Sequence, residues 1–421
     1  MESTIEKECE QNCSTTESDQ IVTPWKVVTK GQFNYERLKD EFGLNPITSE
    51  LIARFEKVTG QSASHLLTRE IFFAHQDFDK ILDAKEAGKE IYIYTGRGPS
   101  AEALHLGHLL PVIFTAELQQ ALDCWVVIEM SDEEKYYFKD GTLDEFMSYT
   151  DSNTKDIIAC GFNPEKTFIF SSFKYECYMR PLIAQFNKKM TVHVTNKIFG
   201  FNDQNTIGQI SWPSYQNAPA LCGSFPFLFG DKKDVMCLVP MAVDQTPYFR
   251  STRDVAESLG FPKPAIICCK FLVGLQGVGE KASSSGQIPP IFMNDSDKDI
   301  TKKINKYAFS GGGATLEEHR KNGGNLSVDV PYIYLFHFLQ DEEELKDIAK
   351  KYSSGEMLSG EIKARLIKEL LKVVNDHTKR RNQITTEMYE KFFTIHVQPS
   401  VAKAFNSFKK KYLYIPIAYS T

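Results

Sequence analysis

One continuous stretch decides the fold of this chain, and it reads Tyr94-Thr95-Gly96-Arg97-Gly98-Pro99-Ser100-Ala101-Glu102-Ala103-Leu104-His105-Leu106-Gly107-His108. The residues that lead into it, 91–94, are β-branched and aromatic and predict a short strand. The glycines and the proline that follow are expected to end that strand. Ser100 is suited to cap a helix that begins at Ala101. The stretch therefore predicts a strand, a loop and a helix in succession.

Two histidines on the predicted helix suggest an anion site. A loop that opens onto a helix N-terminus presents free N–H groups and the positive end of the helix dipole. His105 and His108 are close enough in sequence to share a helix face, and Gly107 between them lets a flat group approach the backbone. Taken alone, two such histidines are more often ordinary surface or core residues. They lack the further ligands that a metal site needs, so no protein-held metal is expected here.

Composition and length place the chain among ordinary globular proteins. It has 421 residues, of which 42% are hydrophobic and 25% charged, which predicts two or three domains. No window approaches the roughly 18 uninterrupted apolar residues of a membrane helix, so no membrane partner is expected. The first twenty or so residues are acidic and polar and lack the pattern of a secretory signal or a transit peptide. We therefore expect a cytoplasmic protein with a disordered tail at 1–20.

The formal net charge of −6 argues mildly against nucleic-acid binding. Two local basic runs, 379–381 and 409–411, leave that possibility open, although a solvated surface is the simpler interpretation of each. Nine cysteines are scattered along the chain. Reduced thiols are expected, with Cys268 and Cys269 buried in a strand; a zinc site at Cys9 and Cys13 is a weak alternative because no second pair completes it.

From residue 90 the pattern alternates between strands and helices. Strands are expected at 91–94, 125–130, 167–170, 235–239 and 265–271, and helices at 143–160, 179–189 and 249–259. Short apolar strands separated by helices indicate an α/β fold with a parallel, Rossmann-like sheet covered on both faces. Ligands of such sheets bind beyond the carboxyl ends of the strands. Four polar residues fall at or just past predicted strand ends: Tyr94, Glu129, Asp244 and Gln276.

A second notable stretch, Gly274–Gly286, is rich in glycine and serine and carries a single lysine, Lys281. Such a loop is suited to closing over phosphates, with the lysine supplying charge and the hydroxyl and N–H groups supplying donors. The alternative is a flexible linker, because the chain changes from alternating strands and helices to a helical pattern soon afterwards.

After residue 295 the chain reads as helical. A capping box at Thr315–Glu318 starts one helix, and further helices are expected at 332–339, at 343–352 and from 359 onward. Before residue 90, a short strand is expected at 25–29 and helices at 35–42, 48–58 and 75–87.

The first stretch contains His105-Leu106-Gly107-His108 and the second contains Lys281-Ala282-Ser283-Ser284-Ser285. In this order and on these elements, they resemble the two signature motifs of the class I aminoacyl-tRNA synthetases. Further stretches narrow the resemblance to the tryptophanyl-tRNA synthetases of the eukaryotic cytosol: 94–100, 132–135, 156–162, 243–250 and 308–312. The resemblance covers roughly residues 22–393.

The resemblance implies the organisation of the chain. It gives an N-terminal extension at 21–88 that packs on the catalytic domain, a class I Rossmann-like catalytic domain at 89–294, an α-helical anticodon-binding domain at 295–385 and a C-terminal segment of uncertain role at 386–421. It also implies a homodimer, and a reaction in which tryptophan is activated by ATP, with Mg²⁺, and then transferred to tRNA(Trp).

The resemblance further assigns roles to individual residues. His105, His108 and Lys281 are the expected catalytic residues, because phosphoryl chemistry depends on positioning and charge neutralisation. The expected ATP-binding residues are Thr95, Gly96, Arg97, Gly107, Asp244, Ser283 and Ser284. The expected tryptophan-binding residues are Tyr94, Glu129, Glu134, Gln245 and Gln276. An indole offers one N–H donor, so its partner must be an acceptor, which Tyr94 and Glu129 provide.

Two positions depart from the family pattern. Glu129 stands where the family usually has glutamine, which keeps the acceptor, loses the amide donor and places a second carboxylate near Glu134, so that one of the two is expected to have a raised pKa. Ala282 stands where a methionine is usual, which predicts a looser loop and weaker ATP binding.

Three other functions share part of this pattern. A tyrosyl-tRNA synthetase would share the fold and motifs, but the expected pocket lacks an obvious donor–acceptor pair for a phenol. A nucleotidyltransferase that does not use tRNA would share the histidine motif, but the helical region after residue 295 argues against it. A non-catalytic paralogue is disfavoured because His105, His108 and Lys281 are all present.

Overall fold

The computed structural model describes residues 20–25, 27–29, 31–283, 286 and 288–413. Residues 1–19 of the tail expected at 1–20, the pair Cys9 and Cys13, and Ser284 lie outside the described residues, whereas Gln20 belongs to a strand. No helix in the described part is both long and apolar enough to cross a membrane.

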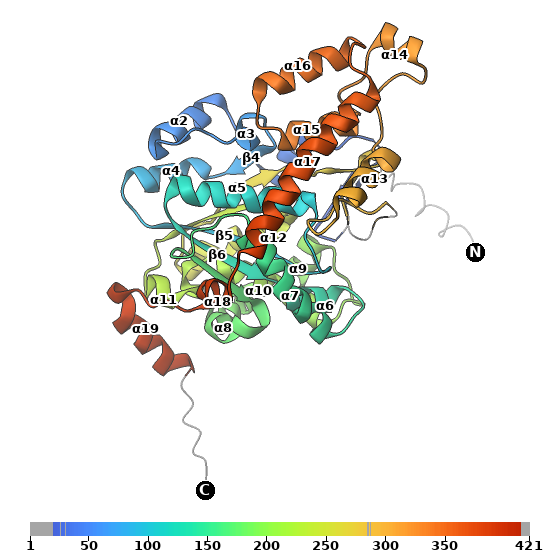
Figure 1. The fold of residues 1–421 in the computed structure, drawn as a ribbon. Coiled ribbons are helices and arrows are strands. Elements are labelled where there is room, and N and C mark those ends of the chain that lie inside the picture. Colours follow the sequence, from blue (N-terminus) through green and yellow to red (C-terminus); the bar gives the residue numbers. More distant parts are fainter. Residues whose placement is uncertain (1–19, 26, 30, 284–285, 287, 414–421) are drawn as a thin grey trace, which may run out of the picture.

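The core of the fold is a seven-stranded sheet with helices on both faces (Figure 1). Its order is β3 (Asn45–Pro46), β4 (Phe72–Gln76), β9 (Ala265–Cys269), β8 (Met236–Ala242), β5 (Ile91–Arg97), β6 (Trp125–Met130) and β7 (Thr167–Ser171). The five strands from β9 to β7 are parallel, whereas β3 and β4 run antiparallel to their neighbours. The expected α/β class with a Rossmann-like parallel sheet is confirmed, with two antiparallel strands added at one edge.

Side chains alternate between the two faces of the strands, as the two-residue period requires. In β5, Ile91 and Ile93 join a core beneath α4 (Phe78–Glu86), α5 (Leu106–Leu122) and α7 (Leu143–Ile158). Tyr92 and Tyr94 join the opposite core. The helices over that second core are α8 (Ser172–Lys189), α10 (Ile207–Asn217), α11 (Pro226–Phe229) and α12 (Thr246–Ala256). Cys268 and Cys269 are buried free thiols in β9, as expected.

The first stretch differs from its predicted form in two ways. Strand β5 continues through Gly96 to Arg97 and does not end at the glycine. The helix predicted from Ala101 begins only at Leu106, with His105 and not Ser100 as its N-cap. The physical reason is a competitor for the backbone: the amide of Asn153 donates to the carbonyl oxygens of Ala101 and Glu102, which a helix would have used for its own hydrogen bonds.

The segment before the first stretch differs in part from its predicted secondary structure. The helix predicted at 75–87 begins later, as α4, because residues 72–76 form strand β4 in the central sheet. The remaining elements here are α1 (Tyr35–Phe42), α2 (Ser49–Thr59), α3 (His65–Thr68) and the two-stranded sheet of β1 (Gln20–Val22) and β2 (Val27–Thr29). The short strand expected at 25–29 is thus found as β2.

The chain between residues 130 and 230 is more helical than predicted. Two further helices here contribute to the site or its surroundings, in addition to α7, α8, α10 and α11. They are α6 (Asp132–Phe138) and α9 (Val192–Phe199). The second notable stretch forms a small hairpin of β10 (Val273–Gly274) and β11 (Gly277–Lys281), whose strand β11 lies beside β2.

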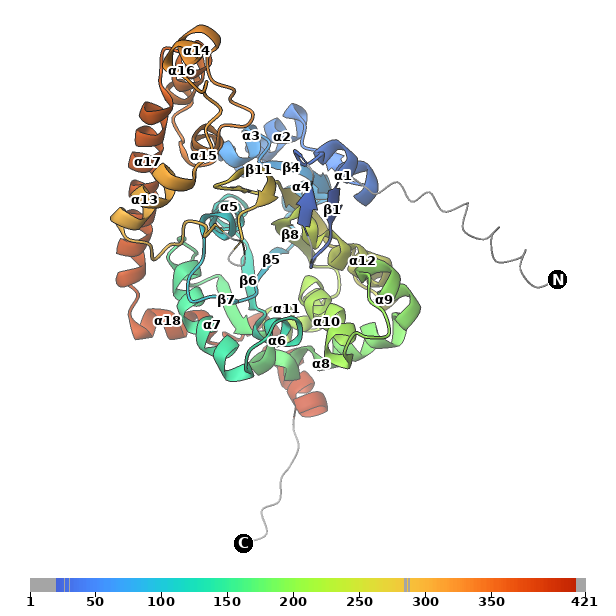
Figure 2. The same cartoon turned by 90° about the vertical axis from the view of Figure 1, so that its right-hand side faces the viewer.

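The helical region stands to one side of the sheet, as Figure 2 shows in orange and red. It comprises α13 (Asp297–Tyr307), α14 (Leu316–Asn322), α15 (Val330–Phe338), α16 (Glu342–Ser353) and α17 (Ser359–Asn382). The capping box predicted at Thr315 is present, with its hydroxyl accepting from the backbone of Glu318 and that carboxylate accepting from the backbone of Thr315. Helix α17 runs from this group back to α7, which packs on the central sheet.

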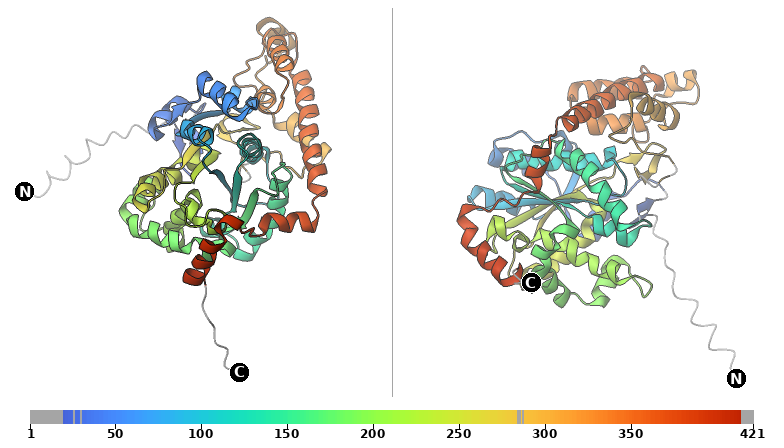
Figure 3. Two further views of the ribbon diagram at one scale, coloured as in Figure 1. Left: turned by 90° about the vertical axis from the view of Figure 1, so that its left-hand side faces the viewer. Right: turned by 60° about the horizontal axis from the view of Figure 1, so that its bottom comes forward.

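The last part of the chain returns to the sheet. Helix α18 (Thr386–Phe393) contacts β7, and α19 (Ala402–Phe408) reaches α11, where Phe405 is buried in the second core (Figure 3). The basic run at 409–411 is exposed, consistent with a solvated surface. The run at 379–381 is different: Arg380 and Arg381 bind α7, so its interpretation as a plain solvated surface is wrong.

Candidate active site

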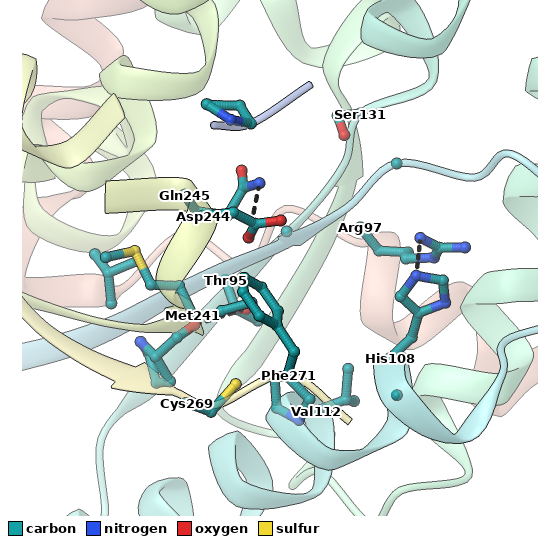
Figure 4. A pocket seen from close by; sticks show the side chains of 18 of the residues that line it. Thr95, Arg97, His108, Val112, Ser131, Met241, Asp244, Gln245, Cys269 and Phe271 are labelled. Atoms are coloured by element: carbon teal, nitrogen blue, oxygen red, sulfur yellow. Dashed lines mark hydrogen bonds between the residues drawn. The ribbon is translucent and has the colours of Figure 1, made fainter. Parts of the chain in front are cut away.

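A cavity of about 290 Å³ opens at the carboxyl ends of β5, β6 and β8, beside the start of α5 (Figure 4). Its position agrees with the rule for ligands of parallel sheets. Twelve of the predicted site residues line it: Tyr94, Thr95, Gly96, Arg97, His105, Gly107, His108, Glu129, Glu134, Asp244, Gln245 and Lys281. Gln276 and Ser283 are described but are not among the residues that line it.

His105 is held at the start of α5 by its neighbours in the chain. The N–H of Leu106 donates to the carbonyl of Ile291 (3.0 Å), and the N–H of Met293 donates to the carbonyl of Leu104 (2.8 Å). Nδ1 of His105 accepts the N–H of Gly107 at 3.2 Å. A neutral imidazole that accepts at Nδ1 carries its proton on Nε2, which is then a donor.

His108 is fixed in a complementary way by Arg97. Figure 4 shows the guanidinium of Arg97 against the ring of His108, and Nη1 lies 3.2 Å from Nε2. A guanidinium only donates, so Nε2 accepts and Nδ1 carries the proton. Nδ1 of His108 is buried and has no hydrogen-bond partner in the described part of the chain. The two rings lie against each other, with centroids 3.5 Å apart and planes tilted by 31°.

Both histidines are neutral at physiological pH. Burial, together with the nearby charges of Arg97 and Lys281, lowers the pKa of His105 to about 3. Burial is also the main cause that holds the pKa of His108 well below its ordinary value, assisted by Arg97. This side of the cavity therefore offers N–H donors from neutral rings, beside the fixed positive charge of Arg97.

Lys281 reaches the cavity from the end of β11 and pairs with Asp244. Its Nζ lies 2.7 Å from Oδ2 of Asp244 and 5.3 Å from the centre of the Phe271 ring. The next residue, Ala282, is anchored by its N–H to the carbonyl of Leu272. A Cβ on Gly107 would lie 3.6 Å from the Cβ of Ala282, so the lysine loop and the start of α5 face each other closely.

On the strand side, the hydroxyl of Tyr94 donates hydrogen bonds to Oε2 of Glu129 and to the carbonyl of Gln216. Oε1 of Glu129 is buried and has no partner among the described residues. Burial raises the pKa of Glu129 to about 8, with Glu134 adding to the rise and Tyr94 opposing it. The raised pKa expected for one of the two carboxylates is thus found at Glu129.

Glu134 and Gln245 complete the polar lining. Glu134 accepts from the hydroxyl of Ser131 (3.0 Å) and from Nζ of Lys135 (2.9 Å). The amide of Gln216 donates to Oε1 of Gln245 (3.1 Å). Sequence reasoning missed Gln216 and Lys135 as parts of the site. The position of Lys135 next to the predicted Glu134 is a signal that could have identified it. Gln216 lies on a helix that the periodicity did not reveal.

The charges of the cavity favour an anion. Arg97, Lys135, Lys270 and Lys281 line it, against the carboxyl groups of Glu129, Glu134 and Asp244. The four cationic side chains outnumber the three carboxyl groups. An anionic group is therefore stabilised on the helix side, while Tyr94 and Glu129 present hydrogen-bonding groups at the strand side.

Comparison with known proteins places the chain in a family. The family described as "tRNA synthetases class I (W and Y)" matches residues 85–375. The cytoplasmic tryptophan–tRNA ligase of Homo sapiens is 47% identical over 386 residues, covering 90% of this chain and 82% of the human protein. That of Dictyostelium discoideum is 46% identical over 383 residues, covering 90% and 96%.

Solved structures agree with this placement. The tryptophanyl-tRNA synthetase of Plasmodium falciparum is 44% identical with a TM-score of 0.83, covering 88% of this chain and 100% of that one. The enzyme of Encephalitozoon cuniculi, solved bound to tryptophan, is 36% identical with a TM-score of 0.81, covering 87% and 99%. A fold, a cavity and a sequence that agree over most of the chain identify it as a member of the class I tRNA synthetase family of the W and Y type.

Proposed function

We propose that the protein is a tryptophan–tRNA ligase that acts in the cytoplasm. The carboxylate of tryptophan attacks the α-phosphorus of ATP, the bond to the β-phosphate breaks, and pyrophosphate leaves. The terminal ribose hydroxyl of tRNA(Trp) then attacks the carbonyl carbon of the adenylate and AMP leaves. The observation that carries this proposal is the single cavity in which a donor-rich, positively charged helix side faces the Tyr94–Glu129 pair.

The helix side takes the nucleotide in this proposal. His105 and His108 donate hydrogen bonds to phosphate oxygens, and Gly107 leaves room for the adenine against α5. Thr95, Gly96 and Arg97 line the path of the phosphates. Lys281 exchanges Asp244 for the departing pyrophosphate, which frees that carboxylate for the ribose hydroxyls. Because attack at phosphorus needs orientation and charge stabilisation, these groups suffice without a covalent intermediate.

The strand side takes the amino acid. Oε1 of Glu129, in its ionised form, and the oxygen of Tyr94 accept the indole N–H, and Glu134 and Gln245 hold the α-ammonium and carboxylate groups. Gln276 and Ser283 stand outside the cavity lining, so their proposed contacts require the segment around the β10–β11 hairpin to move toward the ligand. Ser284 is proposed on the same grounds as Ser283, from the resemblance alone.

The remaining parts of the chain are assigned by the same resemblance. Residues 89–294 form the catalytic domain, residues 295–385 bind the anticodon, and residues 21–88 belong to the catalytic core as an extension. Mg²⁺ enters with ATP and is held by its phosphates. The described residues contain no group of three or more His, Cys, Asp or Glu side chains that could hold a metal ion.

The protein acts as a homodimer in this proposal. Helices α6, α8, α9 and α10 pack against one another, and each exposes a large apolar side chain. The most exposed are Ile207 (87%) and Val192 (61%). Adjacent exposed apolar side chains are typical of a surface that a partner covers.

The test is amino-acid-dependent exchange of pyrophosphate into ATP, with tryptophan and tyrosine measured in parallel, followed by charging of tRNA(Trp). We expect exchange with tryptophan and none with tyrosine, because a pocket built around one indole N–H leaves polar groups unpaired when it holds another ring. Exchange with tyrosine alone would replace this proposal with the tyrosyl enzyme. Exchange with tryptophan but no charging would point to a nucleotidyltransferase.

A further inference from the structure

The loop that precedes His105 is hydrogen-bonded to side chains in the last turns of α7. Asp156 accepts the N–H of Leu104, the residue before His105, at Oδ2 (3.2 Å). One turn earlier, Asn153 donates to the carbonyls of Ala101 and Glu102 and accepts Nε of Arg97 (3.3 Å) at Oδ1. Arg97 in turn contacts His108.

Side chains of α17 form hydrogen bonds with the same part of α7. Nε of Arg381 donates to Oδ1 of Asp156 at 2.7 Å, and a further guanidinium nitrogen donates to the hydroxyl of Ser152 at 2.9 Å. Nε2 of His377 lies 2.9 Å from the carbonyl oxygen of Asp156. Arg380 donates to the carbonyl of Ala159 at 2.7 Å. Cationic side chains at the carboxyl end of a helix are also favoured by its dipole.

Asp156 therefore binds two parts of the chain that are far apart in sequence. One carboxylate oxygen binds the backbone beside His105, and the other binds Arg381 of the helical region. The residue is only 2% exposed, so neither contact can be replaced by water without a large cost. If α17 shifts and Arg381 moves away, either the Asp156 carboxylate moves with it or a buried charge is left unpaired.

We propose that Asp156 is a positioning residue, through which helix α17 sets the backbone of the loop that places His105 in the cavity. The consequence for catalysis rests on the proposed function, and the structural coupling does not. In that setting, an event that moves the helical region changes the placement of His105 relative to the α-phosphate. Small displacements of a catalytic group are costly, since misplacement by about 1 Å lowers rates by about 100-fold.

The test compares Arg381→Gln with Arg380→Gln. The two residues are neighbours on α17 and bind the same end of α7, but Arg380 has no contact with the Asp156 carboxylate among the described contacts. Two readouts are used: amide hydrogen exchange of the segment 99–107, and the kcat and KM of tryptophan-dependent pyrophosphate exchange. Thermal midpoints of both variants are recorded alongside.

In Arg381→Gln we expect faster amide exchange across 99–107 and a fall in kcat of about tenfold or more, with the KM for tryptophan unchanged. Arg381→Lys should restore part of both, because a cation returns to the carboxylate. Arg380→Gln should leave both close to the wild type. Equal behaviour of Arg381→Gln and Arg380→Gln, including equal losses of thermal midpoint without faster exchange at 99–107, would overturn the proposal.

Two further arms keep the outcome decisive. If Arg381→Gln does not fold, Asp156→Asn combined with Arg381→Gln removes the charge and its partner together, and faster exchange at 99–107 is still expected. If the wild-type protein shows no tryptophan-dependent exchange, the proposed function fails. The amide exchange then decides the coupling by itself, since it needs no substrate.

Discussion

The hydroxyl of Tyr94 donates a hydrogen bond to Oε2 of Glu129 at the buried strand side of the cavity, which leaves Oε1 without a partner among the described residues. The two side chains come from adjacent parallel strands, β5 and β6. Because the Tyr94 hydroxyl donates to Oε2, the direction in which Oε1 can accept is fixed once Glu129 is ionised.

The first prediction concerns Glu129→Gln. A glutamine keeps the accepting oxygen, so tryptophan activation should be retained. The measurement is kcat/KM for tryptophan in pyrophosphate exchange at pH 7.5. A loss that corresponds to more than about 2 kcal/mol would show that the carboxyl group itself is required. Glu129→Ala serves as the control that removes the acceptor, and it should lose activity strongly.

The same substitution has a consequence for stability. Burial raises the pKa of Glu129 in the folded protein from its ordinary value of 4.5 to about 8. Between these values the unfolded chain has lost the proton and the folded protein keeps it, so the wild type loses stability as pH rises from about 4.5 to about 8. Glu129→Gln should therefore gain thermal midpoint relative to the wild type, by on the order of 3 °C more at pH 8.5 than at pH 5. Parallel calorimetric scans with no change in the difference would contradict the raised pKa.

A second prediction concerns the histidines. His105 has a pKa of about 3 and that of His108 is also lowered, so both rings are already neutral well below pH 6.5. The kcat/KM for ATP should accordingly show no inflection from histidine protonation between pH 5.5 and pH 7.5. Replacing either histidine by alanine should lower kcat about 100-fold, the usual loss for a donor to the transition state. An acidic limb with a midpoint near 6.5 that disappears in His108→Ala would contradict the neutral assignment.

Lys281→Ala is the third test. Removal of this cation should reduce the kcat of pyrophosphate exchange by about 100-fold while the KM for tryptophan stays the same, because the lysine acts on the leaving group. Lys270→Ala is a useful comparison, since Lys270 also lines the cavity but lies 5.7 Å from the ring of Tyr35 and 5.8 Å from that of Phe73. If exchange by Lys281→Ala equals that of the wild type, the lysine loop has no catalytic part.

Ala282→Met is the fourth test. The Cβ of Ala282 faces Gly107 across the mouth of the site. A longer apolar side chain should add contact between the loop and α5, and we expect the KM for ATP to fall about fivefold from the apolar area buried. Ala282→Ser, which adds no apolar area, is the matched control and should leave the KM unchanged. An equal or higher KM for ATP in Ala282→Met would show that the loop is not loosened by the alanine.

The dimer proposal is tested with Ile207→Glu. A charge at the most exposed apolar side chain should shift sedimentation from dimer to monomer, because a buried unpaired charge disfavours the interface. Leu316→Glu is the control, since Leu316 is 60% exposed on α14, away from this surface. A wild-type protein that sediments as a monomer would remove the proposal, and an Ile207→Glu dimer would place the interface elsewhere.

The sequence predicted the α/β class because five short, largely apolar strands alternate with helices, and it predicted most of the cavity lining through the family resemblance. It misplaced the start of α5, because Ser100 has the chemistry of a cap while the carbonyls after it are taken by Asn153 of a distant helix. Such long-range competition leaves no periodic signal. The helix predicted at 75–87 includes residues 75 and 76 for a related reason: they belong to a strand because β9 pairs with them.

Gln216 shows the same limit within the site. Its carbonyl accepts from Tyr94, and its amide donates to Gln245. Neither contact is visible in the order of residues along α10, which carries polar and apolar side chains without a clear stripe. Arg380 and Arg381 were expected at a solvated surface, and their contacts to α7 arise only once α17 lies against it.

The ring orientations of His105 and His108 have one more consequence. Gly107 and Arg97 each occupy the accepting nitrogen of one ring, so both rings meet a ligand through N–H groups alone. An anionic phosphate oxygen only accepts hydrogen bonds, so it can pair with either ring without a competing proton. This edge of the cavity therefore suits a ligand group that presents acceptors and no donors, and an ammonium group brought to it would set N–H against N–H.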